Sequence, residues 1–485
     1  MKTGFDNEKY LKMQSESIKK RIDMFDSKLY LEFGGKLFDD YHASRVLPGF
    51  DPNSKIEILK QLKDDIEIVF CINASDIEKK KVRADFGITY DKELLRLVNN
   101  LKNIGIYVSS VVITLYKGQQ EVDNFRRILE EEGLNTYVHT FTKGYPTDIE
   151  TIVSEDGYGK NEYIKTSRKI VVVTAPGPNS GKLATCLSQL YHEYKRGNKA
   201  GYAKYETFPV WNLALKHPVN MAYEAATADL GDINMIDAFH LEEYGKSAVN
   251  YNRDLTTFPI LKNILNKIIG EDIYKSPTDM GVNMVGFCIS DDEVIKEASK
   301  KEIIRRYYNV LCDEKLDKID KEAVNRIKVL MNELEINESD LEVVNVAKQK
   351  EIEKSSKVIC IKLTNNKIIT GRETDLLTPS SAMILNAIKE LTNIPDEVFL
   401  LSPSVLEPIL KINKDVYLQK RTKLSLHEVL IALSICKVTN PIINKAMEKL
   451  IKLKDCEAHA SYIVNQEEQD IFKGLGINLT CEPKF

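Results

Sequence analysis

The chain is 485 residues long, more than one hydrophobic core usually serves, so its length excludes a single small domain. Its 68 Lys and Arg residues nearly balance its 72 Asp and Glu residues, and the net charge of -4 argues against a basic protein that binds nucleic acid or anionic membranes. Hydrophobic residues make up 43% of the chain and charged residues 29%, which is typical of a folded protein and argues against extensive disorder.

The first residues and the cysteines indicate the compartment. Residues 1–6 are polar and lead into a charged stretch, with no apolar core of signal-peptide length. The longest apolar runs, such as 170–173, have the length of strands and fall short of the roughly 20 residues that span a bilayer. The eight cysteines are scattered, and no two are spaced as CxxC. We therefore expect a cytoplasmic protein with reduced thiols, no membrane segment and no zinc knuckle.

In the first 205 residues, short apolar runs alternate with helical patterns. We predict strands at 29–33, 66–72, 106–115, 136–142, 170–174 and 201–205, and helices at 7–25, 53–63, 91–103, 119–132 and 181–196. The apolar runs lack the alternation of a half-exposed strand, so both faces of these strands should be covered. The β-α-β order predicts an α/β fold with a doubly wound, mostly parallel sheet, whose ligands bind where the strands end.

The rest of the chain changes character twice. Residues 208–286 are polar, irregular and interrupted by prolines, which is typical of loops that belong to a site, and residues 291–334 are charged and helical. The charged stretch 335–356 is the best linker candidate. Beyond it we predict strands at 358–363 and 367–370 and helices at 380–391, 425–436 and 441–453. We therefore predict an α/β P-loop-like domain at 1–235, a mainly helical insertion or connector at 236–335, and a smaller α/β C-terminal subdomain at 336–485.

The most specific local motif is IVVVTAPGPNSGKLAT at 170–185, where a buried strand, a glycine-rich loop and a helix follow one another. This is the setting of a P-loop, in which successive N–H groups, the positive end of a helix and a lysine bind phosphate. The match is degenerate, because Pro176 replaces the first glycine and Leu183 replaces the hydroxyl that holds Mg²⁺. We predict a phosphate or other anion site formed by Gly177, Asn179, Ser180, Gly181, Lys182 and Thr185. The alternative is an ordinary strand-turn-helix with an exposed lysine.

A second predicted strand ends at a pair of glycines, Gly34 and Gly35, and Arg45 follows soon after. In a parallel sheet this loop would share a crevice with the loop after residue 174 if the two strands are neighbours. Arg45 can bind a phosphate or a carboxylate with two hydrogen bonds. We add Gly34, Gly35 and Arg45 to the predicted ligand site, with a common turn and solvated charges as the alternative.

Acidic and imidazole side chains gather between residues 217 and 243. Asp229, Asp232 and His240 are of the types that bind a divalent ion such as Mg²⁺ or activate water, although their spacing matches no strong metal motif. We predict Asp229 and Asp232 as metal ligands, and Asp229, His240 and Lys182 as catalytic residues. The alternative is that the aspartates cap helices and His240 is only hydrogen bonded.

Three stretches resemble a bacterial family of conserved uncharacterised proteins that is known only as a domain of unknown function. They are PGPNSGKLATC at 176–186, residues 217–240, and GINLTCEP at 476–483. The motifs are long, and the resemblance covers nearly the whole chain. It implies a cytosolic bacterial protein with an α/β amino-terminal region, a helical insertion and a separate carboxy-terminal subdomain. It implies no activity and no catalytic residues.

These patterns favour an enzyme that binds a nucleotide or another phosphorylated small molecule at residues 176–185, with a nucleotide and Mg²⁺ as candidate cofactors. The reaction would be transfer, ligation or hydrolysis in the adjoining cleft. We expect a homo-oligomer, and neither nucleic acid nor a membrane as partner. Two alternatives stay open: a non-catalytic sensor of the same ligand, and a structural protein whose glycine-poor helical region forms the oligomer interface.

Overall fold

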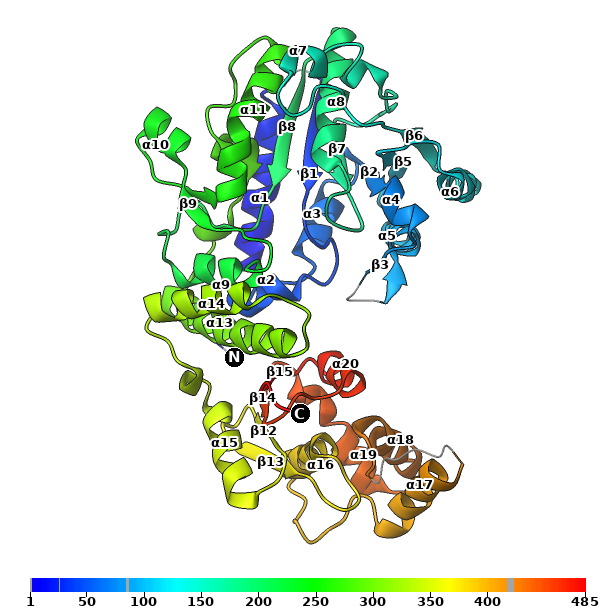
Figure 1. The fold of residues 1–485 in the computed structure, drawn as a ribbon, viewed down its shortest axis with the longest axis vertical. Helices are drawn as coiled ribbons and strands as arrows, with labels where there is room; N and C mark the ends of the chain where they lie inside the picture. The colour runs from blue at the N-terminus through cyan, green and yellow to red at the C-terminus, as the bar shows by residue number, and fades with distance from the viewer. Residues whose placement is uncertain (1, 26, 84–86, 417–422) are drawn as a thin grey trace. The chain divides into compact units, whose positions relative to one another are not determined.

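The computed structural model of the chain describes residues 2–25, 27–83, 87–416 and 423–485 (Figure 1). The chain divides into two compact units. Unit 1 consists of Met1–Glu224 and Gly231–Ser299, and unit 2 consists of Ala225–Leu230 and Lys300–Phe485. This division differs from the three predicted domains, since residues 236–299 of the predicted connector belong to unit 1 and residues 300–335 belong to unit 2.

Unit 1 is built on a sheet that has, within the described ranges, seven strands in the order β11-β8-β1-β7-β2-β5-β6, and every pairing is parallel. The strands are β1 (Lys28–Phe33), β2 (Ile66–Asn73), β5 (Val108–Thr114), β6 (Asn135–Val138), β7 (Ile170–Thr174), β8 (Ala200–Tyr205) and β11 (Gly281–Val282). All residues of β5 and β7 are buried, because helices cover both faces of the sheet. The predicted α/β class with a mostly parallel sheet is confirmed.

Helices alternate with these strands as the sequence predicts. They are α1 (Asn7–Ile22), α3 (Ser54–Gln61), α5 (Tyr90–Asn103), α6 (Gln120–Glu131) and α8 (Lys182–Lys195), and the shorter α2 (Tyr41–Val46), α4 (Ala74–Glu78), α7 (Ile149–Ile152), β3 (Val82–Arg83) and β4 (Ile88–Thr89) lie between them. Helix α8 packs against β1, β7 and β8, and Cys186, Leu187 and Leu190 are among its buried residues. This packing fixes the start of α8 just beyond the end of β7.

The segment 208–286 is more regular than its prolines predicted. It contains α9 (Pro218–Ala226), β9 (Asn234–Ile236), α10 (Ala238–Tyr244), β10 (Val249–Tyr251), α11 (Asn252–Ile269) and α12 (Pro277–Met280). The prediction of an irregular stretch is wrong for α11, which continues through Pro259. Proline costs a helix one backbone hydrogen bond, but burial of Phe258, Ile264 and Leu265 supplies tertiary packing that holds α11 together.

In its described residues, unit 2 combines helices with a mixed four-stranded sheet in the order β13-β12-β14-β15. The strands are β12 (Val358–Lys362), β13 (Ile368–Arg372), β14 (Glu457–Ala460) and β15 (Asn478–Cys481), and the helices are α13 (Asp292–Lys315), which begins in unit 1, α14 (Lys321–Glu333), α15 (Glu342–Lys354), α16 (Pro379–Thr392), α17 (Pro403–Asp415), α18 (Leu426–Cys436), α19 (Pro441–Met447) and α20 (Gln466–Gly474). The predicted linker at 335–356 is largely α15, whose Ala347 packs with Val358 and Cys360 of β12. The prediction of a linker is wrong there. The sequence of α15 is mostly charged, but a few apolar residues form one narrow face of the helix that packs on the sheet.

Two further findings concern the expected compartment. No helix in the described ranges is both long and apolar enough to cross a membrane. All eight cysteines are free thiols, and most of them are buried.

Candidate functional site

The predicted phosphate loop lies at the carboxyl edge of the sheet, between two neighbouring strands. β7 pairs with β1 on one side and with β2 on the other, so that Val173 lies opposite Glu32 and Thr174 lies opposite Phe70. Because the strands are parallel, the chain leaves all three at the same edge. The strand before the Gly34–Gly35 pair is therefore a neighbour of β7, as the shared site requires.

Side chains hold five successive carbonyl groups of the loop, from residue 176 to residue 180. The hydrogen bonds are Arg83 Nη1 to Pro176 O at 3.0 Å, Ser180 Oγ to Gly177 O at 2.7 Å and to Pro178 O at 3.3 Å, Asn73 Nδ2 to Asn179 O at 3.5 Å, and Thr114 Oγ1 to Ser180 O at 3.0 Å. Arg83, Asn73 and Thr114 donate from three other parts of the carboxyl edge, and Ser180 donates from the loop itself. The carbonyl oxygens of the loop are thus occupied by the protein.

The N–H groups of the same loop are not occupied. Within the described residues, the N–H groups of Gly177, Asn179, Ser180, Gly181 and Lys182 donate to no protein acceptor, and α8 begins without a side-chain cap. Asn179 and Gly181 have φ angles of 53° and 80°, the left-handed conformation that turns successive N–H groups into a concave nest. A loop whose carbonyls are bound and whose N–H groups are free is a surface of donors. Such a surface attracts an anion.

Two glycines are required by the close packing around this loop. A Cβ at Gly177 would stand 2.2 Å from Cε1 of Tyr90, and a Cβ at Gly181 would stand 2.8 Å from Cγ2 of Thr114. Both distances are far below van der Waals contact, so only glycine lets the backbone pass at these points. The need for glycine at residues 177 and 181 therefore has a steric basis in the shape of the loop, and their roles in ligand binding stay predictions.

Lys182 is the first residue of α8 and is half-buried, with no hydrogen bond or ion pair to a described residue. Its positive charge acts on the nearby Cys71: burial raises the pKa of that thiol to about 12, and Lys182 opposes the rise. Thr185, one turn further on, is fully buried and receives a hydrogen bond from Cys71 Sγ at 3.4 Å, while its N–H donates to the Gly181 carbonyl at 2.9 Å. Lys182 is thus available to a ligand, whereas both polar groups of Thr185 are engaged.

The buried Lys55 holds the Gly34–Gly35 loop through hydrogen bonds. Lys55 Nζ donates to the carbonyl of Gly34 at 3.2 Å and to Asp40 Oδ2 at 3.2 Å. Gly35 has a φ of 67°, which favours glycine, whereas a Cβ at Gly34 would meet nothing within 4 Å. Arg45 lies exposed on α2, one helix beyond the loop. The loop shape therefore depends on Gly35 and Lys55 more than on Gly34.

Sequence analysis missed a row of charged side chains at the same edge of the sheet. Glu32 on β1 lies opposite Lys204 on β8, and Lys204 Nζ lies 2.7 Å from Glu206 and 3.1 Å from Asp254. Burial raises the pKa of the Glu206 carboxyl, and Lys204 offsets only part of that rise. A buried acid with a raised pKa beside a lysine is typical of catalytic sites. Glu206 could have been recognised from the sequence as a candidate site residue, since it directly follows the predicted strand at 201–205.

The remaining predicted residues lie in separate surroundings. Asp232 is buried and pairs with Arg253 at 3.2 Å, and Nδ1 of His240 lies 3.0 Å from the Ser276 hydroxyl. Asp229 is exposed and belongs to the short stretch 225–230 of unit 2. Among the residues that the structure describes, no three His, Cys, Asp or Glu side chains are grouped to hold a metal ion. The metal and catalytic roles of Asp229, Asp232 and His240 stay predictions.

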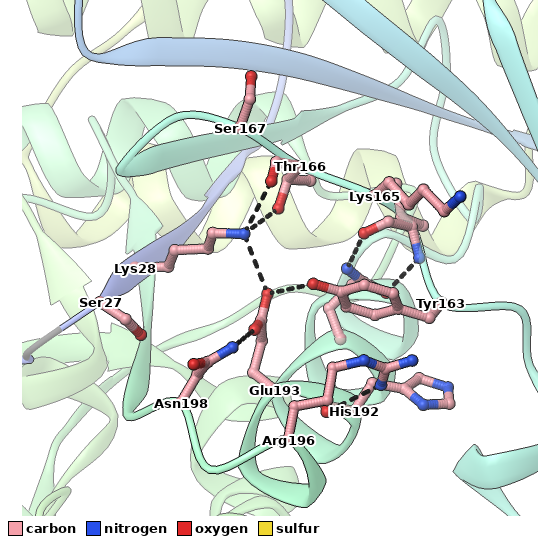
Figure 2. A network of polar contacts seen from close by, with 12 residues as sticks. Ser27, Lys28, Tyr163, Lys165, Thr166, Ser167, His192, Glu193, Arg196 and Asn198 are labelled. Atoms are coloured by element: carbon pink, nitrogen blue, oxygen red, sulfur yellow. Dashed lines mark hydrogen bonds and ion pairs between the residues drawn. The ribbon is translucent and has the colours of Figure 1, made fainter.

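The amino edge of the sheet carries a polar network of another kind, centred on Glu193 near the end of α8 (Figure 2). The buried Glu193 carboxylate accepts hydrogen bonds from Lys28 Nζ at 3.3 Å, Tyr30 Oη at 2.8 Å, Tyr163 Oη at 3.1 Å and Asn198 Nδ2 at 2.8 Å. Figure 2 also shows Lys28 turned toward Thr166, whose hydroxyl lies 2.6 Å from Nζ. Lys28 and Tyr30 belong to β1, whereas Tyr163 and Asn198 lie in the segments before β7 and β8, so the four bonds tie these parts of the chain to α8. We interpret this network as structural, because it lies at the edge opposite the loop.

Comparison with known proteins places the chain in a family. The N-terminal model of the domain of unknown function DUF1846 matches residues 3–335, and the C-terminal model of the same domain matches residues 339–485. A "UPF0371 protein" of Clostridium botulinum (strain Loch Maree / Type A3) is 56% identical over 494 residues, covering 100% of this chain and 98% of the relative. A "UPF0371 protein" of Clostridium tetani (strain Massachusetts / E88) is 54% identical with the same coverage. The resemblance is confirmed, and the chain belongs to the DUF1846 family.

Proposed function

We propose that unit 1 binds the phosphate group of a nucleotide or another phosphorylated small molecule at residues 176–182. The observation that carries this proposal is the polarity of the loop. Protein donors bind the carbonyls of residues 176–180, while the N–H groups of residues 177 and 179–182 have no acceptor among the described residues. Lys182 and the uncapped start of α8 add positive charge at the same place. A phosphate oxygen is the acceptor that these groups lack.

Binding in this proposal does not depend on Mg²⁺. Leu183 stands where a P-loop has the hydroxyl that holds the metal, and the hydroxyl of Ser180 donates to carbonyls of its own loop. Thr185 is buried against Cys71. The loop therefore offers N–H groups and an ammonium group, which bind a phosphate monoester without a metal. We expect AMP or a sugar phosphate to bind equally well in EDTA and in Mg²⁺.

The chemistry that we propose is transfer, ligation or hydrolysis at a group held next to the row Glu32, Lys204 and Glu206. β8 lies two strands from β7, and at ~4.8 Å per strand the row is roughly 10 Å from the loop, a span that a phosphorylated small molecule covers. Glu206, whose pKa is raised by burial, is suited to give a proton to a leaving oxygen. Asp229 and His240 stay as the predicted alternatives for the base.

Titration calorimetry on the full-length protein tests the binding site. The probes are inorganic phosphate, AMP, ATP and a hexose phosphate, each in EDTA and in Mg²⁺. We expect Lys182→Ala to weaken the best ligand at least tenfold, since it removes a charged hydrogen bond of about 1.5–3 kcal/mol. The matched control is Lys195→Ala at the other end of α8, where the lysine pairs with Glu155 at 3.0 Å. Equal affinity of the Lys182→Ala protein and wild type would contradict the proposal.

A second measurement separates an enzyme from a sensor. Each ligand that binds is incubated with the protein, and its products are followed by ³¹P NMR. An enzyme that uses Glu206 loses turnover in Glu206→Gln while the affinity for the ligand stays within a fewfold of wild type. Binding without turnover of any probe would favour the sensor.

A further inference from the structure

Unit 2 contains a cavity of about 720 Å³ that plays no part in the proposed phosphate site. It lies between α16, β13, the end of α15 and the segment 396–401, all of which belong to unit 2. Its volume falls within the roughly 300–1,000 Å³ that small-molecule sites occupy in proteins. A small organic molecule fits within that volume, with one side open to solvent.

The lining of this cavity is chiefly apolar. Leu376, Leu385 and Leu401 line it, and so does Phe399, which is 76% exposed. A ligand that covers the exposed ring of Phe399 removes apolar surface from water, which favours binding. The apolar lining therefore favours a ligand with a hydrocarbon body.

The cavity lining contains more basic than acidic residues, and some of the basic side chains have no ion-pair partner among the described residues. Four basic residues line the cavity, Lys350, Lys354, Arg372 and Lys389, against two acidic ones, Asp375 and Asp396. Lys389 donates to the Asp396 carbonyl at 2.8 Å, and Lys350 pairs with Glu353 at 2.6 Å. The side chains of Lys354 and Arg372 make no hydrogen bond or ion pair with any residue in the described ranges. Two cationic groups are thus left at the rim without an anion.

We propose that this cavity binds a free anionic amphiphile, a molecule with one phosphate or carboxylate head group and a short hydrocarbon chain. Arg372 and Lys354 bind the head group, and the planar guanidinium of Arg372 can form two parallel hydrogen bonds to it. The hydrocarbon chain packs against Leu385 and Phe399. The partner follows from charge complementarity, because a neutral chain would leave both cations unpaired and a bare phosphate would leave the apolar lining uncovered.

The test is titration calorimetry of the full-length protein with octyl phosphate, octanoate, octanol and inorganic phosphate. In the Lys182→Ala background, which disables the proposed phosphate site of unit 1, octyl phosphate and octanoate are expected to bind one per chain and at least tenfold more tightly than octanol or inorganic phosphate. Lys354→Ala combined with Arg372→Ala should weaken octyl phosphate at least tenfold and leave octanol unchanged. Both side chains are exposed, so their removal leaves the fold intact. Octanol binding as tightly as octyl phosphate would overturn the proposal.

Three controls test whether the amphiphile binds in this cavity and as a free molecule. Lys367→Ala removes a lysine of unit 2 that pairs with Glu390 and does not line the cavity, so binding should not change. Octyl phosphate is itself a phosphate monoester that the loop of unit 1 could hold, so its binding is also measured in Lys182→Ala; loss of all octyl phosphate and octanoate binding in that variant would assign both ligands to the loop and overturn the proposal. Flotation with phosphatidic acid vesicles should recover no protein, since co-flotation would identify a membrane lipid in place of a free molecule.

Discussion

Thr114 both anchors the phosphate loop and excludes a side chain from it. Its hydroxyl donates to the Ser180 carbonyl at 3.0 Å, and its Cγ2 lies 2.8 Å from the point where a Cβ of residue 181 would stand. The Thr114 side chain on β5 therefore fixes the position of the loop relative to the sheet and makes glycine necessary at residue 181. The position of the N–H groups that we assign to phosphate depends on this contact.

Gly181→Ala should destabilise unit 1 by about 2–4 kcal/mol, because it adds left-handed strain of about 1–2 kcal/mol to a steric overlap. Urea unfolding followed by tryptophan fluorescence measures this, since Trp211, the one tryptophan of the sequence, lies in unit 1. Thr114→Ser, which keeps the hydroxyl and removes Cγ2, should recover part of the steric loss, since Cβ and Oγ1 of residue 114 still lie 3.0 and 3.1 Å from the added Cβ. An equal loss in the Thr114→Ser background would contradict the proposed contact.

Arg83→Ala should weaken phosphate binding roughly tenfold, because Arg83 holds the Pro176 carbonyl at 3.0 Å while it pairs with Glu93 at 2.9 Å. Arg96→Ala is the matched control, since Arg96 also pairs with Glu93, at 2.7 Å, from the next turn of the same helix, α5. Both variants lose one partner of Glu93 and should lose similar stability. Calorimetry with the best phosphate ligand compares them, and equal affinities would show that Arg83 does not position the loop.

The sequence alone predicted the strand and the start of the helix on either side of this loop. β7 has the predicted bounds, 170–174, because four apolar residues in a row, the β-branched Thr174 and the Pro-Gly pair at 176–177 are strong local signals. The groups that hold the loop, Arg83, Asn73 and Thr114, could not be predicted, because they reach it from β2, β3 and β5. Only the order of the strands brings them together, and local patterns do not determine that order.

Elements with polar sequences were also missed. β14, Glu457–Ala460, carries a charge and an imidazole, so its pattern resembled a loop. In the structure, His459 is fully buried and bonded to Thr480 Oγ1 at 2.8 Å and to Glu482 Oε1 at 3.2 Å. These partners arrive from β15 and the residue after it. Satisfied polar groups can lie in a core, and a single sequence does not reveal their partners.

Glu193→Gln should destabilise unit 1 by about 1.5–3 kcal/mol, because Lys28 would lose its buried charge partner. Phosphate affinity of the folded protein should stay unchanged, since the network lies at the amino edge of the sheet (Figure 2). Tryptophan-monitored unfolding and calorimetry on the same protein give the two values. A matched control is Glu150→Gln, which removes an exposed carboxylate that pairs with Lys267. Loss of phosphate affinity in Glu193→Gln would contradict a purely structural role.

Unit 1 should lose stability as the pH falls from about 6.5 to 4. Burial lowers the pKa of His139 to about 4, and its hydrogen bond to the Glu162 carbonyl opposes this only in part. Between these pH values the unfolded chain binds the proton and the folded chain does not, so acid favours unfolding. The full effect is about 3 kcal/mol, from the difference between 6.5 and about 4.

His139→Gln checks this prediction, because Gln keeps a donor and cannot take up a proton. Urea unfolding at pH 7 and at pH 4.5 should show a smaller loss of stability in this variant than in wild type. His192, whose pKa burial also lowers, acts in the same direction and contributes to the part that remains. The same pH dependence in both proteins would show that His139 is not the group responsible.

The chain crosses between the two units three times: it enters unit 2 after residue 224, returns to unit 1 after residue 230 and enters unit 2 again after residue 299. During synthesis, the stretch 225–230 leaves the ribosome long before residues 300–485, although Ala228 packs within unit 2 and its carbonyl receives a hydrogen bond from Arg326 at 3.4 Å. A gene truncated after residue 299 would therefore yield an amino-terminal fragment in which the partly apolar residues 225–230 lack the rest of unit 2 to pack against. Neither unit can be obtained by a single cut, and separate expression would need residues 225–230 to be replaced or supplied in trans.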